Sequence, residues 1–172
     1  MTDLPYSYVV RVAELPPDGL DLRLEPDADT LEKLGRYVGV AAMHVLSAHL
    51  LIRPIAGDGV HVTGEVAATV RQISVVSLEG FDCDVTEPVD VRFMPEAAIE
   101  RLAAKAEEEE VDIDLPDPIH DGRIDLGALV TEFLALGVDP YPRMPGEVFE
   151  TPAIDETQAS PFAALGQLKN RS

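Results

Sequence analysis

Residues 43–73 read MHVLSAHLLIRPI, then the turn sequence AGDG, then VHVTGEVAATVRQI. In the second run small apolar residues recur at every second position, the period that places side chains on one face of a β-strand. Between the runs, Asp58 and Gly59 tolerate positive φ, as a tight reversal requires. The segment predicts a long antiparallel hairpin with arms Met43–Ile55 and Val60–Ile73.

Further segments carry the same period and extend the predicted sheet. Val85–Phe93 predicts a third strand, and Pro88 inside it predicts an edge position or a strand end, because proline has no N–H to donate. Nearer the N-terminus, Tyr6–Leu15 and Leu20–Leu24 flank a Pro-Pro-Asp-Gly turn. They predict a second, short hairpin.

Two amphipathic helices have recognisable ends. Asp29 stands three residues before a glutamate, the spacing of a capping box, and the helix that it opens is expected to end at Gly39. Asp125 is the expected N-cap of another helix, which closes at Gly137. Beyond that glycine, the proline-rich residues 139–146 predict irregular backbone.

A third amphipathic helix is expected to begin at Pro95 and to run into four consecutive glutamates, Glu107–Glu110. Carboxylates at a helix C-terminus oppose the negative end of the helix dipole and repel one another. The helix is therefore expected to fray here into a mobile acidic loop that continues through Asp121.

Together these elements predict an α+β fold, a mainly antiparallel β-sheet with a long central hairpin and about three amphipathic helices packed on it. With 172 residues, of which 46% are hydrophobic, the chain is long enough to bury one core. We expect a single α+β domain over residues 1–146 and a C-terminal tail over residues 147–172, whose order the sequence leaves open.

The charge of the chain restricts its partners. The formal net charge is −19, and about two-thirds of it lies between Glu79 and Asp121, where fifteen acidic side chains face three basic ones. Nucleic-acid affinity rests largely on Lys and Arg displacing counterions, so bare phosphate backbones are poor partners. Basic proteins, cations and neutral or apolar ligands are compatible with this charge.

The compartment follows from the cysteine count and the N-terminus. A single cysteine, Cys83, excludes a disulfide within the chain and fits a reducing compartment. Residues 1–15 carry acids and a proline where a signal peptide has a basic start and an apolar run, and no run approaches the ~18 apolar residues of a membrane span. We expect a cytoplasmic protein without membrane association.

The string of aspartates from Asp112 to Asp121 invites a calcium interpretation. Counted from Asp112, however, Asp117 takes the place of the glycine in an EF-hand loop, and Arg123 takes the place of the bidentate glutamate. A solvated acidic loop is the better interpretation.

The remaining reactive side chains form no catalytic pattern. His44 and His49 lie five positions apart on one predicted strand, which should point them to opposite faces and not toward a shared metal. Neither Ser74 nor Ser77 lies in a nucleophile elbow. Cys83 stands between two aspartates, which should raise the pKa of its thiol. No catalytic residue, metal or cofactor is therefore expected.

Three segments occur in the order VHVTGEVAATVRQISVVSLEGF, EPVDVRFMPE and GRIDLGALVTEFLALGVDPYPRMPG, followed by SPFAALGQLK near the end of the chain. Together they resemble the YceD family, large ribosomal RNA subunit accumulation proteins formerly catalogued as a domain of unknown function. The likeness covers roughly Tyr6 to Lys169, and Ile124-Asp125-Leu126 is its most specific part. The ending Pro161–Leu165 is similar to the alphaproteobacterial branch.

The resemblance implies a non-enzymatic ribosome biogenesis factor that supports accumulation of 23S ribosomal RNA and assembly of the large subunit. It brings no catalytic residue and no cofactor. Many relatives carry cysteines in the turn after the hairpin, where this chain has Ser74 and Ser77. A redox or zinc role of that turn is therefore not implied for this chain.

Charge and resemblance together predict an acidic surface that binds a basic large-subunit ribosomal protein or a pre-ribosomal particle. One alternative is direct binding of structured RNA through a basic face, and another is a small-molecule or metal-binding protein, which would need a pocket with converging polar groups. The residues expected to bind the partner are Glu107, Glu108, Glu109, Glu110, Asp112 and Asp114. The candidates for RNA contact are Arg11, Arg23, Arg36, Arg53 and Arg71.

Overall fold

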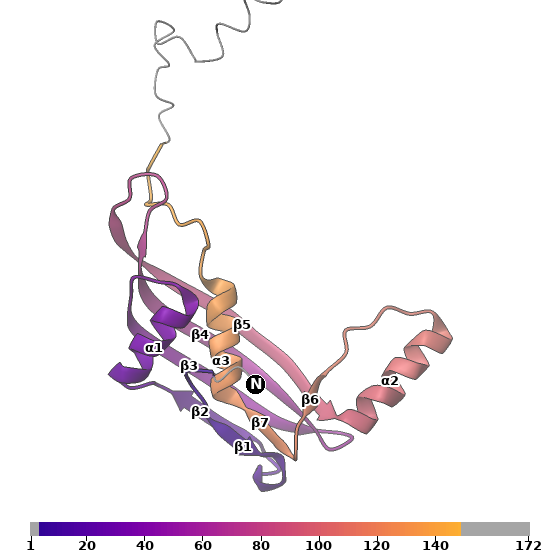
Figure 1. The fold of residues 1–172 in the computed structure, drawn as a ribbon. Coiled ribbons are helices and arrows are strands. Elements are labelled where there is room, and N and C mark those ends of the chain that lie inside the picture. The colour runs from indigo at the N-terminus through magenta and orange to yellow at the C-terminus, as the bar shows by residue number, and fades with distance from the viewer. Residues whose placement is uncertain (1–3, 149–172) are drawn as a thin grey trace, which may run out of the picture.

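The computed structural model describes residues 4–148. Its main feature is a five-stranded sheet in the order β2-β3-β4-β5-β6, accompanied by a two-stranded sheet of β1 and β7 (Figure 1). The elements are β1 (Val9–Arg11), a 3-10 turn (Val12–Glu14), β2 (Leu20–Leu24), α1 (Ala28–Val38), β3 (Ala42–Ile55), β4 (Gly59–Ile73), β5 (Gly80–Pro95), α2 (Glu96–Glu109), β6 (Asp117–Ile119), β7 (Arg123–Asp125) and α3 (Leu126–Gly137). The predicted α+β class is confirmed.

The long hairpin of β3 and β4 is also confirmed. The two strands pair from Ile55↔Gly59 at the turn to Ala42↔Arg71 at the far end. Asp58 in the turn has a φ of 57°, the left-handed conformation that the turn sequence predicts. One irregularity interrupts the pairing, a bulge between Met43 and Val45.

β5 is the predicted third strand. It pairs antiparallel with β4 along its length, from Val60↔Phe93 to Ile73↔Gly80. On its other side β6 pairs, in parallel, only with Phe93–Pro95. Pro88 therefore lies on a stretch with one partner strand among the described residues, which confirms the predicted edge position.

The predicted N-terminal hairpin is wrong. β2 pairs with β3, whereas β1 pairs with β7, more than a hundred residues further along the chain. The 3-10 turn after β1 redirects the chain, and the N–H of Val12 donates to the carbonyl of Gly122, 3.0 Å away. A local turn signal was therefore overridden by a long-range pairing.

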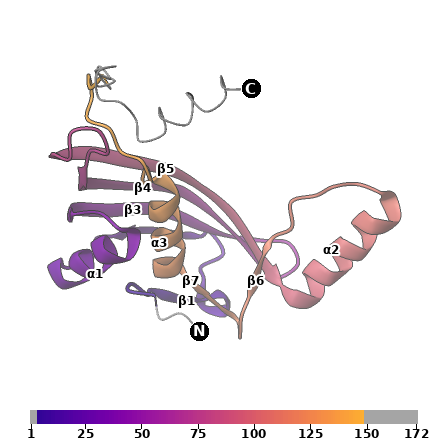
Figure 2. The same ribbon diagram turned by 45° about the horizontal axis from the view of Figure 1, so that its top comes forward.

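α1 and α3 cover one face of the large sheet (Figure 2). The N-cap of α1 is Asp27, whose side chain accepts from the N–H of Thr30, and not Asp29, which lies inside the first turn; Gly39 ends the helix in a left-handed conformation, as predicted. Between helices and sheet lies a core made almost wholly of Val, Leu, Ile and Ala, with Leu34, Leu50, Ile52, Val62, Val66, Leu126 and Leu134 fully buried.

α2 differs from the other two helices because it stands away from the sheet (Figures 1 and 2). It meets β5 and β6 near its first turn, and Ala98 is its one buried residue. No helix among residues 4–148 is both long enough and apolar enough to cross a membrane.

Candidate functional site

The predicted partner-binding residues lie together on one projection, the acidic arm, which we define as residues 96–116. The arm consists of α2 and the connection that returns the chain to β6 (Figure 1). Glu107–Glu110, Asp112 and Asp114 are all exposed along it. The structure therefore brings the six predicted residues into one solvent-facing segment.

The predicted fraying of α2 at the glutamate run is wrong. α2 continues to Glu109, and Glu110 adopts a left-handed conformation with a φ of 51°. The N–H of Val111 then donates to the carbonyl of Ala106 at 3.0 Å, and the N–H of Glu110 donates to that of Glu107 at 3.3 Å. This capping satisfies carbonyls that would otherwise be unpaired, which offsets the dipole penalty of the glutamates.

Beyond the cap, acidic and apolar residues alternate. Val111, Ile113 and Leu115 are exposed at 51%, 40% and 42%, with Asp112 and Asp114 between them. Large apolar side chains usually leave water, so this exposure is informative where it recurs along one segment. The exposed surface of this segment therefore combines apolar area with negative charge.

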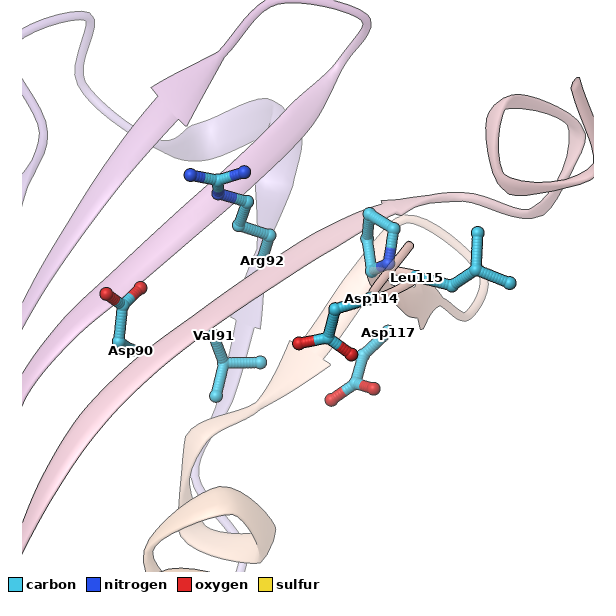
Figure 3. Close-up of a pocket in the computed structure, with 7 residues that line it drawn as sticks. Asp90, Val91, Arg92, Asp114, Leu115 and Asp117 are labelled. Carbon is cyan, nitrogen blue, oxygen red and sulfur yellow. The ribbon is translucent and has the colours of Figure 1, made fainter. Parts of the chain in front are cut away.

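The arm meets the sheet at an open hollow of about 540 Å³ (Figure 3). Asp90, Val91 and Arg92 of β5 line one side, and residues 114–117 line the other. In Figure 3 the side chains of Val91, Asp114 and Asp117 lie on one side of β5, whereas Asp90 and Arg92 leave β5 on the opposite side. Among residues 4–148, no group of three or more His, Cys, Asp or Glu side chains could hold a metal ion.

The face of the sheet opposite the helices carries three histidine–aspartate pairs. The Nε2–Oδ1 distances are 3.2 Å for His44–Asp82, 2.7 Å for His49–Asp21 and 2.6 Å for His61–Asp90. The prediction that His44 and His49 point to opposite faces is wrong, because the bulge between Met43 and Val45 shifts the alternation by one residue. Each histidine has its own carboxylate partner.

Arginines also gather on this open face. Register places Arg53, His61 and Arg92 side by side across β3, β4 and β5, and Arg23 pairs with His49 on the next strand. Arg71 lies on the same face and reaches Asp82 at 3.3 Å. The other two RNA candidates lie elsewhere, Arg11 on β1 beside Glu14 and Arg36 on α1 beside Glu32. Three of the five predicted arginines are thus brought to one face.

A hydrogen bond between Ser74, in the turn after β4, and Glu147, in the segment after α3, joins these two parts of the chain, and we call this contact the polar latch. The buried hydroxyl of Ser74 donates to the carboxylate of Glu147 and accepts from the N–H groups of Val76 and Ser77. Hydrogen bonds from Ser74 and Ser77 lower the pKa of Glu147. The sequence gives no signal for this contact, because nothing local connects residues so far apart in the chain.

Cys83 lies beside this latch. Its thiol donates to the side-chain carbonyl of Gln72 at 3.2 Å, and the amide of Gln72 donates to the carbonyl of Asp139 at 2.9 Å. Burial is the largest cause that raises the pKa of the Cys83 thiol, and the negative charges of Asp84 and Asp82 raise it further. The direction of this shift agrees with the prediction. A raised thiol pKa makes Cys83 a poor nucleophile at neutral pH.

The latch should loosen in acid. Because folding lowers the pKa of Glu147, its contribution is complete above the ordinary carboxylate range and is lost as the pH falls through the folded-state value. We expect the Val75 amide, which donates to Pro142 at 2.9 Å, to exchange faster with solvent in that window after correction for intrinsic exchange. Hydrogen exchange measured by NMR checks this.

The Glu147→Gln variant should lose this acid dependence and show fast Val75 exchange at every pH. Asp139→Asn is the matched control, because Asp139 lies in the same segment but its carboxylate accepts from its neighbour Tyr141. An unchanged acid profile in Glu147→Gln would show that another group titrates.

A family model described as "Large ribosomal RNA subunit accumulation protein YceD" matches residues 62–169. The chain belongs to the YceD family. No curated protein and no solved structure shows a significant match to it. The YceD match begins inside β4 and includes β5, the acidic arm and α3, whereas β1, β2, β3 and α1 precede it. The candidate surface therefore lies in the part of the chain that carries the YceD signature.

Proposed function

We propose that this protein is a non-enzymatic, cytoplasmic factor that supports accumulation of 23S ribosomal RNA by holding a basic large-subunit ribosomal protein on the acidic arm. The family description supplies the setting, accumulation of large ribosomal subunit RNA. The observation that carries the proposal is the exposure of Glu107–Glu110, Asp112 and Asp114 on a projection that stands away from the core.

The charge of the arm gives this binding a physical basis. An acidic surface accelerates encounter with basic partners and repels RNA, so a bound ribosomal protein would be kept from non-cognate RNA until delivery. The exposed apolar residues Val111, Ile113 and Leu115 add area that charge alone does not. Such a complex would be sensitive to salt without depending on charge only.

Replacing the six carboxylates by amides should reduce capture of basic ribosomal proteins from cell extract at low salt. Exposed ion pairs contribute about 0.2–1 kcal/mol each, so six of them predict at least roughly a tenfold loss. The same variant should fail to restore the large-subunit peak in sedimentation profiles of cells that lack the protein.

A matched control removes six exposed carboxylates away from the arm and so has the same net charge. Equal losses of capture in both variants would show that only the total charge of the protein matters. The proposal would be refuted if the wild-type protein captured no basic ribosomal protein. The control substitutions are Asp18→Asn, Glu25→Gln, Asp29→Asn, Glu32→Gln, Glu79→Gln and Glu132→Gln.

Direct RNA binding through the open face is the weaker candidate. Arg23, Arg53, Arg71 and Arg92 lie there, but acidic side chains alternate with them across the strands, and the three histidines already face aspartates. Phosphate binding requires an excess of positive charge, which this face lacks. A gel shift with ribosomal RNA fragments separates the candidates, because direct binding would weaken steeply with salt.

A further inference from the structure

The outer edge of β5 is open over most of its length. β6 covers only Phe93–Pro95, so from Gly80 to Arg92 no described strand pairs with this side (Figures 1 and 2). An unpaired strand edge presents N–H and C=O groups that can bind another extended chain. The hollow beside Asp114 and Asp117 lies where the pairing of β5 with β6 ends, at Phe93 and Asp117, and the open edge of β5 begins.

The prolines establish which amides face outward. Pro88 pairs in register with Glu65 of β4 without interrupting the ladder, so its nitrogen faces away from β4. N–H direction alternates along a strand, so the amides of Asp84, Thr86 and Asp90 share that outward direction. Pro54 of β3, in register with Val60, lies beyond the residues that pair with β2 and obeys the same rule.

The side chains along this edge specify the chemistry of a partner strand. Asp82, Asp84 and Asp90 point to the open face, where their pairing with β4 side chains leaves them exposed. The alternate positions, such as Cys83 and Val91, point to the helix-covered face and are half-buried. A partner strand therefore meets mainly carboxylates on the open face, where Arg92 is the one basic residue of β5, and mainly apolar side chains on the helix-covered face, where Glu87 is the exception.

A second copy of the chain fits this edge poorly. Pairing β5 with another β5 would bring aspartates toward aspartates, and two chains of charge −19 repel. Pro88 removes one donor and limits uncontrolled pairing further. A strand in which basic residues alternate with apolar ones meets neither obstacle.

We propose that the open edge of β5, Gly80–Arg92, binds an extended basic segment of the partner as an added strand, with lysine or arginine over Asp82, Asp84 and Asp90 and apolar residues on the opposite face. This inference rests on the proposed function for the sign of the partner's charge. It adds the mode of binding, main-chain pairing continuous with the acidic arm at the hollow beside Asp114.

The experiment titrates the isotope-labelled full chain with a short synthetic peptide in which lysine alternates with valine or threonine. A second peptide of the same sequence is N-methylated at every second residue, which keeps charge and side chains but removes backbone donors. We expect the methylated peptide to bind at least about tenfold more weakly, because main-chain pairing is lost. Exchange of the outward amides of Asp84, Thr86 and Asp90 should slow at least about tenfold with the first peptide.

Thr86→Pro should reproduce the loss from the side of the protein, because it removes an outward N–H while the ladder with β4 is kept. Thr86→Val is its control, because valine suits a strand and retains the amide. Circular dichroism compares the folds, and the methylated peptide tests the edge without any variant.

Several results would overturn the strand addition. Equal affinity for both peptides, or slowed exchange confined to the acidic arm, would leave the proposed function standing without it. If the outward amides are already protected without peptide, the edge is occupied by something else. Protection that is independent of protein concentration would indicate residues 149–172, and protection that rises with protein concentration would indicate a second copy of the chain. No binding of either peptide refutes the edge, while capture of ribosomal proteins tests the function separately.

Discussion

Among alanine substitutions of the described glycines, Gly64→Ala should destabilise the protein most. Gly64 lies in the middle of β4 with a φ of 155°, and a Cβ there would stand 2.0 Å from the carbonyl oxygen of His49 on β3. Backbone atoms on a central strand cannot move aside as a flexible side chain can. We expect a loss of about 3–5 kcal/mol in the free energy of unfolding, measured by urea denaturation.

Gly39→Ala is the matched control. Gly39 caps α1 with a φ of 77°, but no atom lies within 4 Å of its added Cβ. Its cost is the left-handed conformation alone, about 1–2 kcal/mol. If the two variants unfold at the same urea concentration, close approach of β3 and β4 does not limit residue 64.

The sequence predicts the hairpin because period-two patterning and turn chemistry agree there. The two strands on either side of Asp58 each bury one face, and a shift of the strand register by one residue would turn all of these buried side chains to the solvent. Val85–Phe93 follows by the same logic, and Pro88 indicates its edge position. Local pattern and long-range packing point the same way in these elements.

Prediction fails where a distant contact or an irregularity decides the outcome. The Pro-Pro-Asp-Gly turn suggests that β1 pairs with β2, but β7 supplies the partner of β1. The bulge after Met43 places His44 on the face of His49, and no residue type announces it. The Ser74–Glu147 contact likewise joins segments that nothing in the sequence relates.

The candidate site divides in the same way. The six acids of the arm are evident from composition, but the helical extent of α2 depends on the left-handed cap at Glu110. The open edge of β5 depends on how short β6 is, which follows from where the arm returns to the sheet. Charge was visible in the sequence, whereas the strand available for pairing was not.

The negative charge of β5 restricts which strands can pair with its open edge. A free edge of this length would ordinarily be an aggregation hazard. Aspartates along β5 and the net charge of −19 discourage pairing between copies, and the same aspartates favour a basic strand. Under the proposed function, the acidity of this protein serves selectivity as well as attraction.

Asp125→Ala should separate the N-terminal segment from α3. One carboxylate oxygen of Asp125 caps α3 by accepting from the N–H groups of Gly127 and Ala128 at 2.9 and 3.1 Å, and it also accepts from the N–H of Tyr8 at 2.8 Å. The other oxygen accepts from the hydroxyl of Ser7 at 2.6 Å. One side chain thus holds a helix start and a distant strand together.

The approach is close as well as polar. A Cβ on Gly127 would lie 2.6 Å from the backbone of Ser7 and Tyr8, and the N–H of Leu126 donates to the carbonyl of Tyr8 at 2.9 Å. Removing the carboxylate leaves the amides of the buried Gly127 and the half-buried Ala128 without their acceptor, whereas water can reach the donors of the exposed Ser7 and Tyr8. We expect Asp125→Ala to cost about 2–4 kcal/mol, a lost cap together with lost hydrogen bonds to a charged group.

Asp125→Asn separates shape from charge. Asparagine is a good N-cap and keeps one acceptor oxygen, so its cost should be about 1 kcal/mol. Amide exchange adds a local readout, because Tyr8 and Ala128 should both lose protection in Asp125→Ala. A loss at Ala128 without one at Tyr8 would mean that the carboxylate caps α3 but does not hold β1, and the pairing of β1 with β7 would then stand without it.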